Sequence, residues 1–293
     1  MGLHGPNAEM PFWVCIKWVL RRRRLCCRVF NVERPDRHAL LNLISQPLGP
    51  NPLRLFWYGL GTLLLLLAWD FSGLDLWMAR WSGSASGFPL ESNWFWRGVL
   101  HVPMRNMGWL LELSLLVAIF RPFGVLRQLP VERRVQLALT PLIALIAMSG
   151  IKVHSQTSCP WDLKEFGGMA TYVSHWAWGV QDGGSGGCFP AGHASTGFAF
   201  VGGFFAFRLA RPVIARRWLA VALLAGLVLG IAQQVRGAHY MSHTLWTAWL
   251  CWAVAVAVEG VVSQWIAQRP SRALAPGPDF AAPKPLMPPA SHG

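Results

Sequence analysis

Apolar residues fill most of the chain in long runs that shorter polar loops separate. Six runs approach the roughly 20 apolar residues that a helix needs to cross a bilayer. They are Leu55 to Trp77, Val99 to Phe120, Val135 to Ile151, Pro190 to Phe207, Trp218 to Val235 and Leu245 to Ile266. Polar residues interrupt the first two runs, at Asp70 and Asp75 and at Arg105 and Glu112. The pattern predicts an all-α fold, a bundle of six transmembrane helices.

The composition agrees with a membrane protein. Hydrophobic residues make up 53% of the chain and charged residues 13%, and there are 17 tryptophans. A soluble domain of this size rarely has such a composition. The net charge of +13 would also suit a nucleic-acid partner, but the basic residues cluster in short loops between apolar runs. We therefore interpret them as topology signals and expect no nucleic acid as a partner.

Arginines mark alternate loops. They are Arg21 to Arg24 with Arg28 before the first run, Arg121, Arg127, Arg133 and Arg134 before the third, Arg208, Arg211, Arg216 and Arg217 before the fifth, and Arg269 with Arg272 after the sixth. Because positive loops remain in the cytoplasm, both termini are predicted to be cytoplasmic. The loops 78–98, 152–189 and 236–244 then face the opposite side, which is the periplasm if the chain lies in a bacterial inner membrane.

Three regions follow from this pattern. Residues 1–54 form a basic cytoplasmic segment, and residues 55–268 form the membrane domain. The early apolar stretch from Phe12 to Leu20 is short and runs into four arginines, so it does not indicate a cleaved signal peptide. Residues 269–293 are rich in Pro and Ala, which predicts a disordered tail.

Polar residues gather at the predicted periplasmic face. Lys152 ends the third run, His193 begins the fourth, and the loop between the fifth and sixth carries Arg236, His239 and His243. Cations in this position bind an anion, and histidines transfer protons or act as nucleophiles. We therefore predict a site for a phosphate group at this membrane face, with His154 and His175 as loop residues and Asp162 as a possible positioning group.

The segments that carry these residues resemble the motifs of the type-2 phosphatidic acid phosphatase superfamily, which is related to the vanadium haloperoxidases. That family has Lys, six residues, Arg-Pro; then Pro-Ser-Gly-His; then Ser-Arg, five residues, His, three residues, Asp. Here the first two motifs are Lys152 with Cys159-Pro160, and Pro190-Ala191-Gly192-His193. In the third, His239 matches the histidine, Gln233 stands in place of the arginine, and His243 stands in place of the aspartate.

The resemblance covers about residues 135–255 and implies a divergent bacterial membrane subgroup with a six-helix bundle. It implies a lipid phosphatase of the phosphatidic acid type, whose partners are the bilayer and a phosphorylated membrane lipid. In this interpretation Lys152 and Arg236 bind the phosphate, and Gly192 lets the backbone approach it. His239 attacks phosphorus, and His193 protonates the leaving alcohol and then activates water. No metal or cofactor is required.

Several roles stay open at this stage. His243 is expected to accept a hydrogen bond from His239, although the roles of these two histidines could be exchanged. The backbone N–H groups from Gly183 to Gly187 are expected to add an anion-binding nest. Cys159 and Cys188 are expected to form a disulfide in the oxidising periplasm, closing a loop of about 30 residues.

Other functions also stay open. A phosphotransferase between membrane lipids would use the same residues. Paired histidines at helix ends are also compatible with a haem-binding membrane cytochrome. A lipid-binding or transport protein without catalytic activity is a further alternative. It does not explain why the basic residues Lys152 and Arg236 gather at one membrane face.

Overall fold

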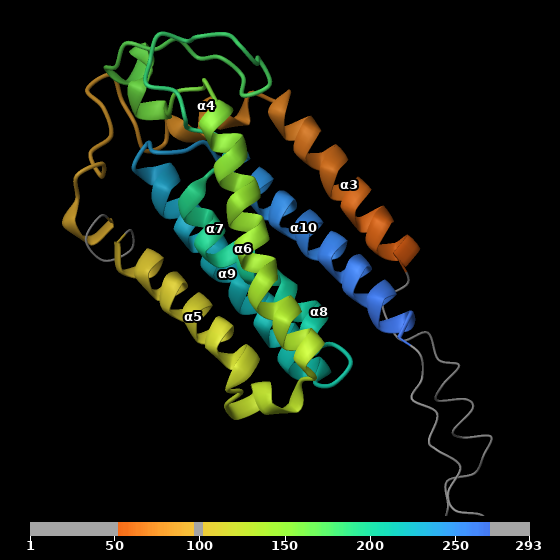
Figure 1. The fold of residues 1–293 in the computed structure, drawn as a ribbon. Helices are drawn as coiled ribbons and strands as arrows, with labels where there is room; N and C mark the ends of the chain where they lie inside the picture. The colour runs from red at the N-terminus through yellow and green to blue at the C-terminus, as the bar shows by residue number, and fades with distance from the viewer. Residues whose placement is uncertain (1–51, 97–101, 270–293) are drawn as a thin grey trace, which may run out of the picture. The chain divides into compact units, whose positions relative to one another are not determined.

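The computed structural model describes residues 52–96 and 102–269 (Figure 1). The long helices are α3 (Pro52–Asp70), α5 (Val102–Phe120), α6 (Val131–His154), α9 (Pro212–Val235) and α10 (Met241–Ala267). The short helices are α4 (Leu74–Ala79), α7 (Gly192–Phe198) and α8 (Gly203–Phe207), with 3-10 turns η2 (Gly124–Gln128), η3 (Pro160–Asp162), η4 (Lys164–Phe166) and η5 (Ala199–Gly202). These residues contain isolated bridges but no named strand, so the all-α prediction is confirmed. The N-terminal segment and the Pro/Ala-rich tail lie outside the described residues, apart from their edges.

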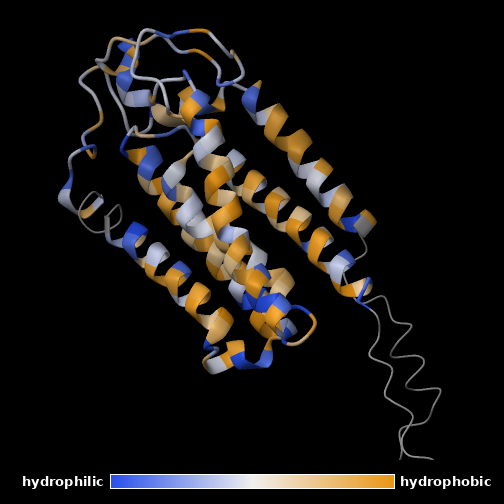
Figure 2. Cartoon of the chain, viewed as in Figure 1, coloured by the Kyte–Doolittle hydropathy of each residue, from blue (hydrophilic) through white to orange (hydrophobic). Residues whose placement is uncertain are grey.

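Five helical segments are long and apolar enough to cross a membrane. They are Leu53–Phe71, Pro103–Gln128, Val131–His154, Pro212–Val235 and Met241–Ala267. Hydrophobic residues run along them, and hydrophilic residues gather near the ends and in the loops (Figure 2). This finding indicates a multi-pass membrane protein.

The fourth predicted run differs from the other runs. It folds as α7, η5 and α8 in succession, from Gly192 to Phe207, and most of its side chains are buried inside the protein. A Cβ atom on Gly197 would lie 2.2 Å from the backbone nitrogen of Gly226 in α9. Glycine at position 197 therefore lets α7 pack directly against α9. Most apolar side chains of this run are buried against other helices and are not on the lipid-facing surface. Among the described residues, five of the six predicted runs meet the length and hydropathy of a spanning helix.

The first run also differs from its prediction, because it does not continue to Trp77 as one helix. Helix α3 ends at Asp70, and Gly73 with φ of 72° turns the chain into α4. In the first turn of α4, Asp75 accepts hydrogen bonds from the Ser242 backbone N–H (2.9 Å) and from Trp69 Nε1 (3.0 Å). Asp70 is thus the last residue of α3, and Asp75 holds the first turn of α10 in place.

Two arginines of the predicted topology signals have a structural role at the opposite end of the bundle. Arg133 in α6 and Arg208 after α8 both form ion pairs with Glu259 of α10, and Gln136 donates to the same carboxylate at 2.8 Å. The Glu259 side chain is 6% exposed. This network ties three helices together at the end away from the motif loops.

Candidate functional site

A cavity of about 280 Å³ lies where the three motif segments meet. Its walls are formed by Arg105, Lys152, Cys159, Trp161, Gly192, His193, Thr196, Gln233, Arg236, Ala238 and His239. The structure thus brings together five of the six residues predicted to act on or bind the phosphate. His243 is the exception.

Covalent and hydrogen bonds fasten the three segments to one another. Cys159 and Cys188 form the expected disulfide, with their Cα atoms 5.2 Å apart. The Cys188 N–H donates to Thr157 O at 2.9 Å, and the Trp161 N–H donates to Gly237 O at 3.0 Å. The first-motif loop is therefore held against both the second and the third motif.

Glycine is required at the end of α9. Gly237 has φ of 76°, in the left-handed region, and a Cβ atom there would lie 2.4 Å from the Phe88 ring. This conformation turns the chain out of α9 immediately after Arg236, so that His239 returns to the cavity.

In the glycine-rich loop before Cys188, three of the N–H groups expected to form an anion nest have acceptors within the protein. The N–H groups of Gly184, Gly186 and Gly187 donate to Asp182 Oδ1 (3.0 Å), Ser158 Oγ (3.1 Å) and Ser155 O (2.8 Å). None of these glycines lines the cavity. Because these three donors are occupied by protein acceptors, they support the first-motif segment and are not available to an anion.

Arg236 is held in place by two acceptors. Its Nε donates to Glu91 O at 3.0 Å, and its Nη1 donates to Gln233 Oε1 at 3.2 Å. Gln233 occupies the position of the family's arginine and is 2% exposed. Its Nε2 has no hydrogen-bond partner among the described residues. Gln233 therefore orients the guanidinium and presents an amide donor beside it.

His239 is buried, with an exposed fraction of 6%. Burial is the main cause that lowers its pKa from 6.5 to about 3, and the nearby positive charges of Lys152 and His193 lower it further. Its Nδ1 lies 3.6 Å from Cys188 Sγ. The imidazole is consequently neutral at physiological pH.

His243 lies behind the cavity and is 1% exposed. Its ring centroid is 5.9 Å from that of His239. The ring centroids of Phe189 and Tyr240 lie 5.2 and 5.0 Å from it. Neither ring nitrogen has a hydrogen-bond partner among the described residues. The predicted hydrogen bond from His239 is therefore absent. The two rings are in van der Waals contact instead.

A buried polar pair lies on the far side of His243. His175 Nε2 is 3.4 Å from Asp70 Oδ2, and both side chains are at most 5% exposed. Trp176 and Trp246 donate their indole N–H groups to the same oxygen at 2.8 and 2.9 Å. His175 belongs to a loop as predicted, but its ring stacks on Phe189 at 4.4 Å inside the protein. Asp162, a possible positioning group, accepts hydrogen bonds from Cys159 N–H (3.2 Å) and Ser185 Oγ (3.1 Å) and fixes the turn.

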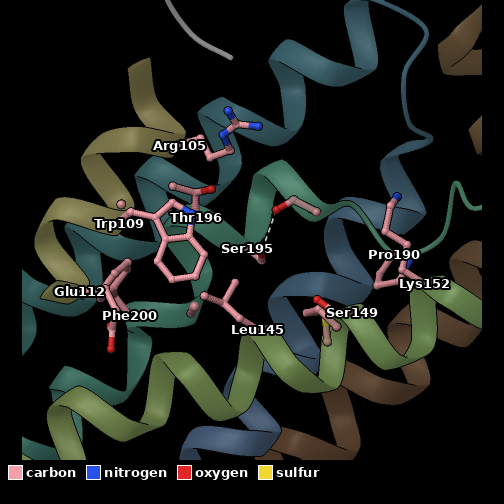
Figure 3. A pocket seen from close by; sticks show the side chains of 14 residues that line it. Arg105, Trp109, Glu112, Leu145, Ser149, Lys152, Pro190, Ser195, Thr196 and Phe200 are labelled. Atoms are coloured by element: carbon pink, nitrogen blue, oxygen red, sulfur yellow. Dashed lines mark hydrogen bonds between the residues drawn. The ribbon is translucent and has the colours of Figure 1, made fainter. Parts of the chain in front are cut away.

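A second cavity has a volume of about 190 Å³ (Figure 3). The two cavities share Arg105, Lys152, Gly192 and Thr196 as lining residues. In the hydropathy pattern Arg105 is visible only as an interruption of an apolar run. A charged residue inside such a run is itself a signal of a functional position.

One cluster has the atom types of a metal site. Cys159, Cys188 and His239 offer sulfur and nitrogen atoms that lie within 4.8 Å of one another. Metals bind cysteine as the thiolate. Because the two sulfurs are joined in a disulfide, this cluster does not have the donors of a metal site in the oxidised protein.

Comparison with known proteins identifies the family. Residues 134–267 match the sequence model of the PAP2 superfamily. Neither a curated protein nor a solved structure matches the chain. The matched range includes Lys152, His193, Arg236 and His239, whereas Arg105 lies before it. The match assigns residues 134–267, which carry the three motif segments, to the PAP2 superfamily, that of the type-2 phosphatidic acid phosphatases.

Proposed function

We propose that this protein is an integral membrane phosphatase that hydrolyses a phosphate monoester or diphosphate on a lipid. The observation that supports this proposal is the single cavity lined by Lys152, Arg236, His193 and His239. Members of the superfamily are generally phosphatases. Cations and neutral imidazoles around one small cavity suit phosphoryl transfer, whose transition state spreads negative charge over the equatorial oxygens.

The phosphate group is bound by positive charge and by fixed donors. Lys152 and Arg236 line the cavity from the end of α6 and the end of α9, and Arg105 adds a third cation from α5. The amide of Gln233 supplies a neutral donor beside Arg236. Arg236 thus replaces the family arginine from a position three residues later in the chain.

His239 is the proposed nucleophile. Its low pKa keeps the ring neutral, so one nitrogen has a lone pair. Since Nδ1 lies against the Cys188 sulfur, a proton on Nδ1 faces a weak acceptor and Nε2 is left to attack. The Nε2–P bond forms while the bond from phosphorus to the leaving oxygen breaks, giving a phosphohistidine.

His193 is the proposed acid and base. It stands in the first turn of α7 on the wall of the same cavity. It donates a proton to the leaving alcohol and then removes a proton from the water that attacks the phosphohistidine. Inorganic phosphate leaves, and His239 is restored. His243 contributes by packing against the His239 ring, which limits the orientations of the nucleophile.

An apolar cavity supports the assignment of a lipid substrate. Its volume is about 600 Å³, and most of its lining comes from the apolar side chains of α5 and α9. It shares Gly108, Thr196 and Phe200 with the second cavity. The second cavity in turn shares lining residues with the phosphate cavity, which is the one where the three motif segments meet. A hydrocarbon chain in this space would be continuous with a phosphate held by Lys152.

The first test measures phosphate release by the purified protein. The panel contains phosphatidate, phosphatidylglycerol phosphate, a polyprenyl diphosphate and lipid A phosphates. We expect release from at least one lipid, and we expect both His193→Ala and His239→Ala to lower the rate by about 100-fold or more.

The two variants should differ in one further respect. With a good leaving group such as 4-nitrophenolate, His193→Ala should still form an acid-labile phosphoenzyme, whereas His239→Ala should form none. Phosphate trapped on His243 would contradict the assigned roles, and transfer to a second lipid in place of water would indicate a phosphotransferase.

We further propose that the site faces the periplasm of a bacterial inner membrane. The disulfide beside the cavity suits an oxidising compartment, and the arginine-rich turns lie at the other ends of the same helices (Figure 1). Ser185 is exposed in the loop beside the site. A Ser185→Cys variant should react with a membrane-impermeant thiol reagent in intact spheroplasts; reaction only after lysis would reverse the topology.

The low pKa of His239 also predicts a dependence of stability on pH. The unfolded chain binds the proton near pH 6.5 and the folded protein only near pH 3, so stability is lost as the pH falls through this range. Between pH 7.5 and 5.0 this loss is about 2 kcal/mol. Thermal unfolding should show that His239→Asn loses about that much less than the wild type, whereas His154→Asn at an exposed position behaves as the wild type. Equal pH dependence in all three proteins would contradict the assignment.

A further inference from the structure

The second cavity has opposite chemistry at its two ends. Arg105 and Lys152 also line the cavity where the motif segments meet, whereas Glu112 lines only the second cavity (Figure 3). Arg105 and Glu112 are seven residues apart on α5, which corresponds to about 10 Å along a helix. The wall between them is mostly apolar and includes Trp109, Leu145 and Phe200.

Glu112 is an exception to the usual pairing of buried polar groups. It is 2% exposed, and neither carboxylate oxygen has a hydrogen-bond partner among the described residues. Leaving a buried carboxyl group without a partner costs free energy. The other glutamate buried in the bundle, Glu259, has two arginines and a glutamine as partners. Glu112 lines the second cavity and has no such partner among the described residues.

We propose that this cavity binds the leaving group of the substrate, and that Glu112 selects a leaving alcohol that carries a second hydroxyl or ammonium group. The inference rests on the proposed phosphatase function. A phosphate held by Lys152 directs its ester oxygen into the shared space, and a donor farther along the alcohol reaches the carboxyl oxygens of Glu112. The substrate class is therefore a phosphorylated amphiphile with a polar unit between the phosphate and the hydrocarbon chain.

Glu112 also discriminates against other substrates. A purely hydrocarbon alcohol would leave the carboxyl group unpaired in a cavity from which it displaces water. A second phosphate in this position would bring its oxygen acceptors against the oxygen acceptors of Glu112 and would supply no donor. Sites that offer a hydrogen bond to a substrate hydroxyl reject analogues without it far more strongly than apolar pockets reject a missing methylene.

The test uses two series of short inhibitors. One series is alkyl phosphates of three to eight carbons, and the other is the matching ω-hydroxyalkyl phosphates. Inhibition constants are measured against the lipid that the protein hydrolyses best. At one chain length the hydroxylated compound should bind the wild type about tenfold or more tightly than its alkyl partner.

Glu112→Leu removes the acceptor and keeps a similar volume, and an apolar residue at a buried site favours folding. This variant should prefer the alkyl compound at every length. Glu165→Leu, at a surface position paired with Arg80, should retain the wild-type preference. A wild type that prefers alkyl phosphates throughout would overturn the inference even if the variant failed to fold. Absence of phosphate release from every lipid would instead contradict the proposed function.

Discussion

The contact between α7 and α9 is the constraint on which the site depends. Gly197 and Gly226 let the two backbones touch, because a Cβ atom at Gly197 would lie 2.2 Å from the backbone nitrogen of Gly226. Helix α7 carries His193 in its first turn, and α9 ends immediately before Arg236. A wider separation of these helices would move the proposed acid away from the cation and from His239. The short, glycine-rich helix is thus a requirement of the site geometry.

Charged side chains are arranged in two different ways at opposite ends of the bundle. Glu259 pairs with Arg133 and Arg208, so charge is balanced within the protein and the network joins helices. At the motif end, Arg105, Lys152 and Arg236 surround a cavity. An anion that enters this cavity is stabilised more strongly than it would be at an exposed surface, because less water screens it. The first arrangement serves folding, and the second is suited to binding phosphate.

The disulfide between Cys159 and Cys188 connects the fold to the proposed chemistry. It holds the loop after Lys152 beside the loop before His193, and its sulfur touches the ring of His239. Cys159, which stands at the position of the family's first-motif arginine, is thus bonded to the cysteine that supports the proposed nucleophile. At the third motif, where Gln233 stands in place of the family's arginine, Arg236 supplies the positive charge and Gln233 orients it.

Much of this site could be predicted because polar residues are rare in and beside the apolar runs and therefore stand out in the sequence. Lys152, His193, Arg236 and His239 stand at the ends of such runs, and the alternation of arginine-rich loops places those ends together. The break in the fourth run, the burial of His243 and the pairing of Asp70 with His175 could not be predicted in the same way. Each depends on which neighbours pack against a residue, and hydropathy along a single chain does not contain that information. Arg105 and Glu112 were visible as charges in a span, but only the fold shows that they line one cavity.

The most direct test of the account is a structure determined with orthovanadate, which mimics the transition state of phosphoryl transfer. We expect vanadium bonded to His239 Nε2 inside the cavity, with its equatorial oxygens contacting Lys152 and Arg236 and an apical oxygen near His193. Vanadium bonded to His243, or no vanadate in this cavity, would contradict the central claim that these three motif segments form one phosphate-binding catalytic site.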